Sequence, residues 1–188
     1  MLVNILSILI IVGFFFMEIA LRRGGEAKSW EAGQSDRHST TLIVMAYVVC
    51  GIALFVASPL NQSNIALLPQ WTDWLGIIIA LAGLGFRIWS MRVLGKFYTR
   101  TLKVSESQSV VRDGPYRLIR HPGYLGSILI WVGLAASTTN WIILLFVLAV
   151  FFGVYAFRIQ SEEKMLLSTL PDYAEYRRHT WKLIPLVY

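Results

Sequence analysis

Five apolar stretches separated by polar segments constrain this chain more than any other feature. A helix needs about 20 predominantly apolar residues to cross a membrane. Hydrophobic residues make up 56% of the chain, compared with about 45–50% in typical soluble domains, and they are concentrated in these stretches. The expected spans are residues 2–21, 41–58, 71–91, 122–136 and 141–157. The sequence therefore predicts an all-α, polytopic membrane protein with five transmembrane helices.

The flanking residues predict where the spans end. Pro59 should end the second span, and Pro122 should lie in the first turn of the fourth, where its missing N–H is not needed. Only residues 137–140 separate the last two spans, so we expect a tight antiparallel hairpin. No Lys or Arg precedes the first stretch and no small-residue cleavage site follows it, so we do not expect a cleaved signal peptide.

The positive charges predict an orientation. None of the 17 Lys and Arg residues lies in the first 21 residues, in 59–73 or in 137–140. With five spans, the basic segments share one side, which the positive-inside rule makes cytoplasmic, with the N-terminus outside. The net charge of +6 therefore indicates topology and attraction to anionic lipid, and we exclude nucleic acid as a partner because no soluble basic face is present.

Residues 110–126, V-V-R-D-G-P-Y-R-L-I-R-H-P-G-Y-L-G, form the polar passage around which the chain is organised. Gly114-Pro115 and His121-Pro122-Gly123 are turn signals. The exposed N–H groups of the helix that follows would form an anion site. A cofactor that carries a carboxylate could dock there.

Ionisable residues inside membrane spans are functional candidates. For Arg87 we weigh a role at the site against a snorkelling anchor, and for Glu18 we favour a structural role. Cys50 is expected to be a packing residue. The three histidines lack companion ligands at metal-site spacing, so no metal site is predicted.

The end of the fifth span and the tail carry a second group of polar residues. If that helix continues, Arg158 and Glu162 lie on one face, either as an ordinary ion pair or as site residues. Tyr173 and Tyr176 are either site residues or an interfacial aromatic belt.

These motifs together resemble a known family. The combination of G-P-Y-R-L-I-R-H-P-G-Y-L-G, a hydrophobic hairpin, R-x-x-x-E-E-x-x-L and a tail with Y-x-x-Y is similar to the isoprenylcysteine carboxyl methyltransferases. The resemblance covers residues from about 94 to 185. The wider superfamily includes phospholipid N-methyltransferases and, more distantly, membrane sterol reductases that bind NADPH.

The resemblance implies a membrane methyltransferase of one domain, 1–188, with S-adenosylmethionine bound on the cytosolic side by the region of about 94–188. Arg158 matches the family's substrate-side arginine, and Gln108 stands where the family often has a histidine. The implied cofactor-binding residues are Gln108, Ser109, Val110, Val111, Tyr116, His121, Pro122, Gly123, Tyr124 and Glu162.

The chemistry of these residue types agrees with that reading. Tyrosine faces attract a sulfonium cation, and Arg158 could orient a carboxylate acceptor by two hydrogen bonds. We therefore expect O-methylation of an isoprenylcysteine-like carboxylate, with the lipophilic acceptor entering from the bilayer. A phenolic lipid, quinone precursor or phospholipid amine is an alternative acceptor. An NADPH-dependent membrane reductase and a non-enzymatic scaffold are alternative functions.

Overall fold

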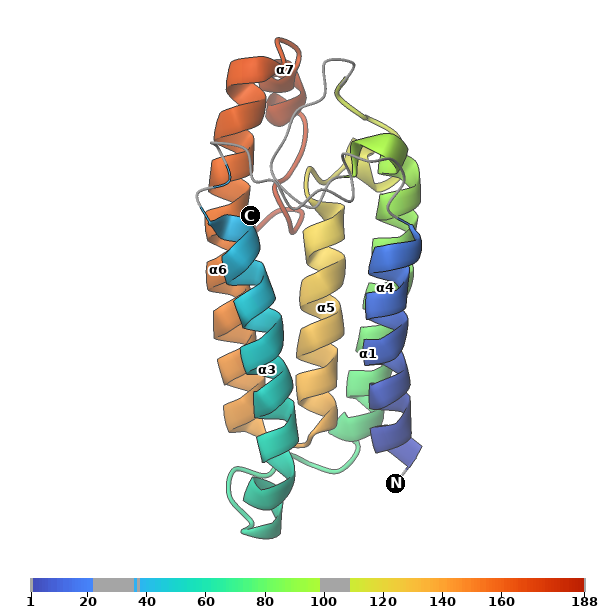
Figure 1. The fold of residues 1–188 in the computed structure, drawn as a ribbon, viewed down its shortest axis with the longest axis vertical. Helices are drawn as coiled ribbons and strands as arrows, with labels where there is room; N and C mark the ends of the chain where they lie inside the picture. The colour runs from blue at the N-terminus through green and yellow to red at the C-terminus, as the bar shows by residue number, and fades with distance from the viewer. Residues whose placement is uncertain (1, 22–35, 37, 99–108, 188) are drawn as a thin grey trace.

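The computed structural model describes residues 2–21, 36, 38–98 and 109–187, and it is built from helices (Figure 1). Within these residues, β-structure is limited to two isolated bridges, Leu67 with Asn140 and Ile119 with Trp181. The prediction of an all-α fold is confirmed. The elements are α1 (Leu2–Ala20), α3 (Ser39–Gln62), α4 (Thr72–Leu94), η2 (Gly95–Phe97), η3 (Gly114–Arg117), α5 (Pro122–Ser137), α6 (Trp141–Thr169) and α7 (Tyr173–Arg178).

Four of these helices, α1, α3, α4 and α6, are long and apolar enough to cross a membrane. Helix α5 is also apolar but has 16 residues, which gives a length of about 24 Å against a hydrocarbon core of about 30 Å. It begins at Pro122, as predicted, and three residues separate its end at Ser137 from the start of α6 at Trp141. The predicted tight hairpin is confirmed.

The end of α3 differs from the prediction, and the end of α6 meets the condition under which Arg158 and Glu162 share one face. Helix α3 continues through Pro59 to Gln62, so the prediction that Pro59 ends this helix is wrong. Proline removes one backbone donor, which membrane helices tolerate, and the helical hydrogen bonding continues past it, since the Ser63 N–H bonds the Pro59 carbonyl at 3.3 Å. Helix α6 runs on to Thr169 and carries Arg158 and Glu162 beyond the apolar stretch.

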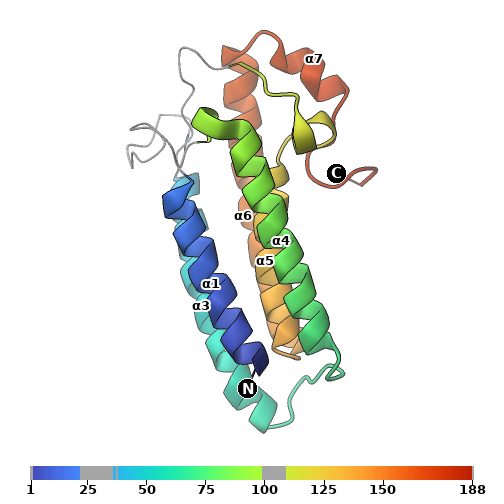
Figure 2. The ribbon, with the colours of Figure 1, turned by 90° about the vertical axis from the view of Figure 1, so that its right-hand side faces the viewer.

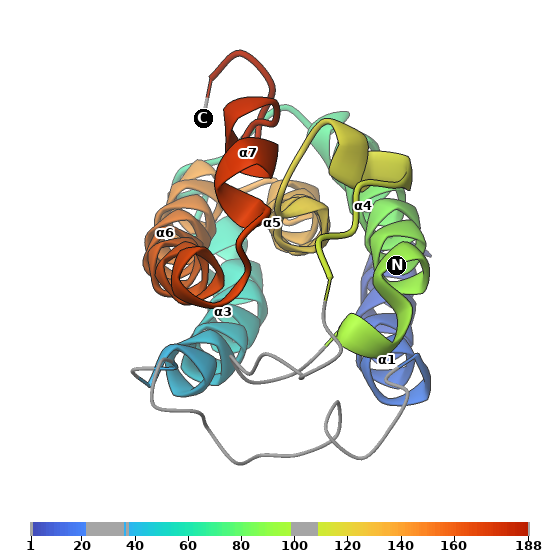
Figure 3. The same cartoon turned by 90° about the horizontal axis from the view of Figure 1, so that it is seen from above.

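The helices form two pairs on either side of α5. Helix α1 packs on α4, and α3 packs on α6, while α5 packs on both α4 and α6. Figures 2 and 3 show this arrangement, with α1 and α3 on the side away from α5. The core residues include several aromatic side chains, and Cys50 is fully buried among them, in agreement with the predicted packing role.

Glycines bring α4 and α5 into close contact. Gly76 and Gly83 on α4 are seven residues apart, as are Gly126 and Gly133 on α5, so each pair lies on one helix face. A Cβ atom added to Gly133 would lie 2.5 Å from the backbone nitrogen of Ala80. Added to Gly126, it would lie 2.8 Å from the Cβ of Arg87. We call these four glycines the glycine seam. Small residues of this kind let membrane helices pack closely.

The C-terminal segment covers the beginning of α5. The Arg120 N–H bonds the Trp181 carbonyl at 2.8 Å, and the His121 N–H bonds the Lys182 carbonyl at 3.1 Å. The Tyr176 hydroxyl donates to the Tyr116 carbonyl at 2.7 Å. Residues that are far apart in the sequence therefore meet where the polar passage enters α5.

Candidate functional site

One cavity of about 830 Å³ lies between the two helix pairs. Its polar end is formed by the passage before α5, the end of α6 and α7, and its apolar end by α1, α3 and α5. Eight of the residues predicted to bind the cofactor line it: Ser109, Val110, Val111, Tyr116, His121, Gly123, Tyr124 and Glu162.

The remaining predicted site residues differ in position. Arg158 also lines the cavity. Pro122 is buried in the first turn of α5 and is not among the lining residues. Gln108 lies outside the described residues.

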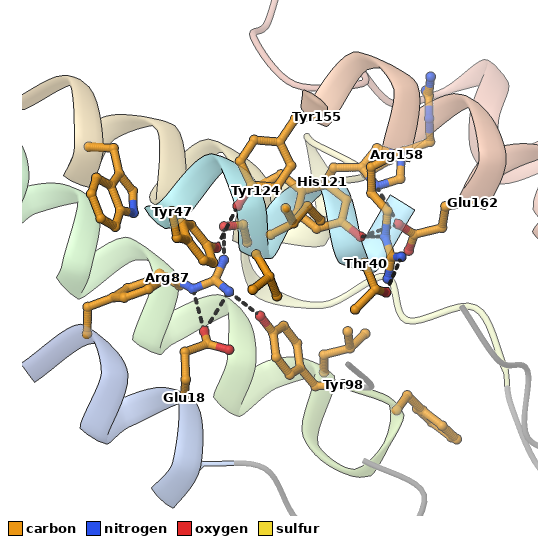
Figure 4. Close-up of a pocket in the computed structure, with 18 of the residues that line it drawn as sticks. Glu18, Thr40, Tyr47, Arg87, Tyr98, His121, Tyr124, Tyr155, Arg158 and Glu162 are labelled. Atoms are coloured by element: carbon orange, nitrogen blue, oxygen red, sulfur yellow. Dashed lines mark hydrogen bonds and ion pairs between the residues drawn. The ribbon is translucent and has the colours of Figure 1, made fainter. Parts of the chain in front are cut away.

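Tyr124 connects the predicted cofactor residue to the predicted acceptor residue. Its hydroxyl donates to Glu162 Oε2 at 2.5 Å and accepts from Arg158 Nε at 3.1 Å. Figure 4 shows Tyr124, Arg158 and Glu162 together at one side of the cavity. The two predicted roles therefore belong to neighbouring groups joined by one hydroxyl.

His121 is fixed on three sides at the N-terminal end of α5. Its ring stacks on Tyr124 with 5.6 Å between centroids and 10° between planes. Its Nε2 lies 3.3 Å from Glu163 Oε1, and its Nδ1 lies 3.8 Å from Glu162 Oε2. Glu163 also accepts from Arg120 Nε at 2.7 Å. Through these contacts Glu163 holds the polar passage in place. It is not among the residues that line the cavity.

Arg158 is held by residues that the sequence analysis did not identify. Its Nη1 donates to Asp36 Oδ1 at 2.5 Å, to Ser39 Oγ at 2.7 Å and to Thr40 Oγ1 at 3.0 Å. Burial raises the pKa of Asp36, but the Thr40 hydrogen bond and the Arg158 cation outweigh it, so the pKa lies below its usual value. A signal in the sequence was a short group of polar residues, Asp36, Ser39 and Thr40, just before and at the start of α3.

A second charged cluster lies on the opposite side of the cavity (Figure 4). Arg87 Nε and Nη2 donate to Glu18 Oε1 at 2.8 and 2.6 Å, and Nη2 also donates to the Tyr98 hydroxyl at 2.6 Å. Its Nη1 donates to the Gly123 carbonyl at 2.6 Å and to Ser127 Oγ at 2.5 Å. Arg87 is only 3% exposed, so the snorkelling alternative is wrong.

This arrangement limits what Arg87 can do. A guanidinium has five N–H donors, and the five contacts to Glu18, Tyr98, Gly123 and Ser127 use them. Arg87 therefore joins α1, α4 and the first turn of α5, and it positions the Gly123 carbonyl at the start of that turn.

Tyr173 and Tyr176 line the cavity and are both buried, so the interfacial-belt alternative is wrong for them. Burial raises the pKa of Tyr173, and it raises that of Tyr176 to about 12. Burial likewise raises the pKa of Tyr116. These phenols are therefore neutral at physiological pH. The Tyr173 hydroxyl has no hydrogen-bond partner within the described part of the chain.

The apolar end of the cavity is bordered by α1 and α3. The lining side chains Phe15, Ile19, Val48 and Ile52 are also among the exposed apolar residues. The cavity is therefore bordered on this side by surfaces that would face lipid. No group of three or more potential metal ligands occurs among the described residues.

Comparison with known proteins identifies the family. Residues 71–171 match the family model described as phospholipid methyltransferase. The chain belongs to this family. The matched region of this phospholipid methyltransferase family member begins just before α4 and ends just after α6. It includes the glycine seam, the polar passage and both Arg158 and Glu162.

The relatives include one whose name agrees with the predicted resemblance to isoprenylcysteine carboxyl methyltransferases and one named for metal resistance. The protein-S-isoprenylcysteine O-methyltransferase of Saccharomyces cerevisiae is 25% identical over 145 residues, which are 76% of this chain and 61% of that protein. The cobalt-zinc-cadmium resistance protein CzcN of Cupriavidus metallidurans is 28% identical over 144 residues, with coverage of 76% and 61%. This chain thus spans about three fifths of the length of each of these two relatives.

A solved structure has the same fold. The eukaryotic intramembrane Ras methyltransferase ICMT (isoprenylcysteine carboxyl methyltransferase) matches with a TM-score of 0.65 and 22% identity, over 77% of this chain and 52% of that chain. The predicted similarity in fold is therefore confirmed for this phospholipid methyltransferase family member.

Proposed function

We propose that the protein is an S-adenosylmethionine-dependent methyltransferase that acts on a lipophilic acceptor, and that the acceptor group is an isoprenylcysteine-like carboxylate. The observation that supports this proposal is the continuity of the cavity. Its polar end contains the residues that the resemblance assigns to the cofactor, and its apolar end extends between two helices that would face lipid.

The residues at the polar end fit the cofactor. Val110 and Val111 offer apolar contacts for the adenine, and Glu162 offers a carboxylate for the ribose hydroxyls or the α-amino group. The Tyr173 hydroxyl, which has no partner among the described residues, offers a further hydrogen bond. When bound, S-adenosylmethionine would supply an electrophilic methyl group on a sulfonium. The stacked rings of His121 and Tyr124 would lie beside that cation.

The protein's own contribution to transfer is positioning. Asp36, Ser39, Thr40 and Tyr124 hold Arg158 in place beside the cavity, where its positive charge can orient an acceptor carboxylate. A carboxylate is already ionised at neutral pH, whereas a phenol, with a reference pKa of about 10, would need a base. Glu163 is engaged by Arg120 and His121 and does not line the cavity. A carboxylate acceptor therefore requires fewer protein groups than a phenol.

The membrane arrangement is part of the proposal. We infer five spans in one methyltransferase domain, 1–188, with the N-terminus outside and the C-terminus and the cofactor site in the cytoplasm. Support comes from the distribution of Lys and Arg along the sequence, which concentrates them in the segments expected on one side of the membrane.

Calorimetric titration of the purified protein with S-adenosylhomocysteine, and separately with NADPH, tests the cofactor. We expect binding of the first ligand only. In Glu162→Ala, binding should be lost, whereas Arg158→Ala should bind the ligand and fail to methylate N-acetyl-S-farnesylcysteine. Binding of NADPH alone would move the cavity to a reductase, and binding of neither ligand would favour the scaffold. Equal behaviour of the two variants would contradict the assigned roles.

A further inference from the structure

Helix α3 presents a continuous strip of residues to the cavity. The lining positions begin at Thr40 and recur every three or four residues as far as Gly51 and Phe55, which is the spacing of one helix face. Thr40 contacts Arg158 and marks the polar end. At 1.5 Å per residue, Gly51 lies about 17 Å and Phe55 about 22 Å farther along the helix.

Gly51 is the place on this strip where a side chain is missing. A Cβ atom added there would meet no atom of the described residues within 4 Å. Its neighbours on the strip, Val48 and Ile52, carry branched side chains. The glycine therefore widens the cavity at one level without being needed for close helix packing, unlike the glycine seam, where an added Cβ would collide with backbone atoms.

We infer that Gly51 determines which hydrocarbon chain lengths the acceptor can have, because the chain must pass this level to reach Phe55. The inference rests on the proposed function, in which the acceptor's reacting group lies beside Arg158. Its hydrocarbon tail would then continue along the strip, since the polar and apolar ends belong to one cavity.

The lengths of prenyl groups agree with this geometry. An extended chain advances about 1.1–1.2 Å per bond, one third of the rise of an extended residue. From its carboxylate, an S-geranyl, S-farnesyl or S-geranylgeranyl cysteine would extend roughly 13, 17 or 22 Å. The geranyl group ends before Gly51, the farnesyl group reaches it, and the geranylgeranyl group reaches Phe55.

The test is to fill this level with Gly51→Leu. A leucine on a helix leans toward the N-terminus, so it would meet the end of a farnesyl chain. We measure calorimetric binding of the three N-acetyl-S-prenylcysteines to protein saturated with S-adenosylhomocysteine, and KM and kcat for their methylation. Affinity for the farnesyl and geranylgeranyl compounds should fall by about tenfold or more, while that for the geranyl compound stays within about twofold.

Two matched controls have open space but do not line the cavity. Gly85 on α4 and Gly153 on α6 also have no atom within 4 Å of an added Cβ, and both are exposed. Gly85→Leu and Gly153→Leu should leave all three affinities unchanged. If Gly51→Leu binds all three compounds as the unsubstituted protein does, or weakens all three equally, the inference is overturned.

Failure of the proposed acceptor can be distinguished from failure of this inference. Linear alcohols of matching lengths carry no carboxylate, and their binding is measured in the same variants. If the unsubstituted protein binds no prenylcysteine but Gly51→Leu selectively loses the longer alcohols, the proposed acceptor is wrong and the length limit stands. If the alcohols show no selective loss either, the length limit is wrong.

Discussion

The buried ion pair between Glu18 and Arg87 makes a quantitative prediction about stability. The two side chains are 12% and 4% exposed and lie 2.6 Å apart. Removing one partner of a buried pair usually destabilises by about 3–5 kcal/mol because the other charge stays buried. Glu18→Met should therefore lower the free energy of unfolding by that amount. Arg87→Met should lower it further, since Gly123 and Ser127 would also lose a donor, at about 1 kcal/mol each.

The double variant separates the pair from its surroundings. With both charges replaced by apolar groups, no uncompensated charge remains, so the loss should be smaller than the sum of the single losses by about 3 kcal/mol. The assay is reversible unfolding in mixed micelles by titration with sodium dodecyl sulfate, followed by circular dichroism. If the single losses add to within about 0.5 kcal/mol, the two residues do not interact in the folded protein and the reasoning is refuted.

Three further variants test other contacts. Gly133→Ala should lower the free energy of unfolding by about 1–3 kcal/mol in the same assay, because its methyl group would meet the α4 backbone at 2.5 Å. Gly153→Ala, which has open space, should leave this free energy unchanged. Equal stability of the two variants would contradict the close packing proposed at the glycine seam. Tyr124→Phe removes the hydroxyl that holds Glu162, so S-adenosylhomocysteine should bind about fivefold more weakly by calorimetry, about 1 kcal/mol; unchanged affinity would show that this hydrogen bond is dispensable. The depressed pKa of Asp36 means that its ionised form stabilises the fold above the unfolded pKa of about 4 and that this contribution is lost as pH falls through the folded value. Unfolding free energies between pH 6 and 3 should therefore fall more steeply for the unsubstituted protein than for Asp36→Asn, and parallel curves would exclude this role.

Local features of the sequence predicted the parts of the fold that depend on local chemistry. Apolar stretches predicted the positions of the five main helices, and Pro122 predicted the start of α5 because proline suits a first helical turn. The boundary at Pro59 was wrong because a proline near the end of a membrane helix removes one hydrogen bond without ending the helix. The family motif named eight residues that do line one cavity.

The contacts between distant segments were not predictable in the same way. Nothing in the sequence pairs Asp36 with Arg158, which lie 122 positions apart, or Glu18 with Arg87. The glycine seam left a signal, a seven-residue spacing on both helices, but such spacing acquires meaning only when the partner helix is known. The roles of the lining residues remain predictions that the proposed experiments test.

The glycine seam also separates the helices in which substitutions are strongly restricted from those in which they are not. Substitutions on the facing surfaces of α4 and α5 meet backbone atoms, so that block, which lies within the family match at residues 71–171, resists variation. Helices α1 and α3 lie outside that match and contribute side chains to the apolar wall, and at Gly51 an added methyl group meets nothing. Changes there can reshape the wall while the polar end is retained. A protein engineer can therefore keep α4 and α5 unchanged and substitute residues of α1 and α3. In this way the proposed acceptor preference could be altered one helix at a time.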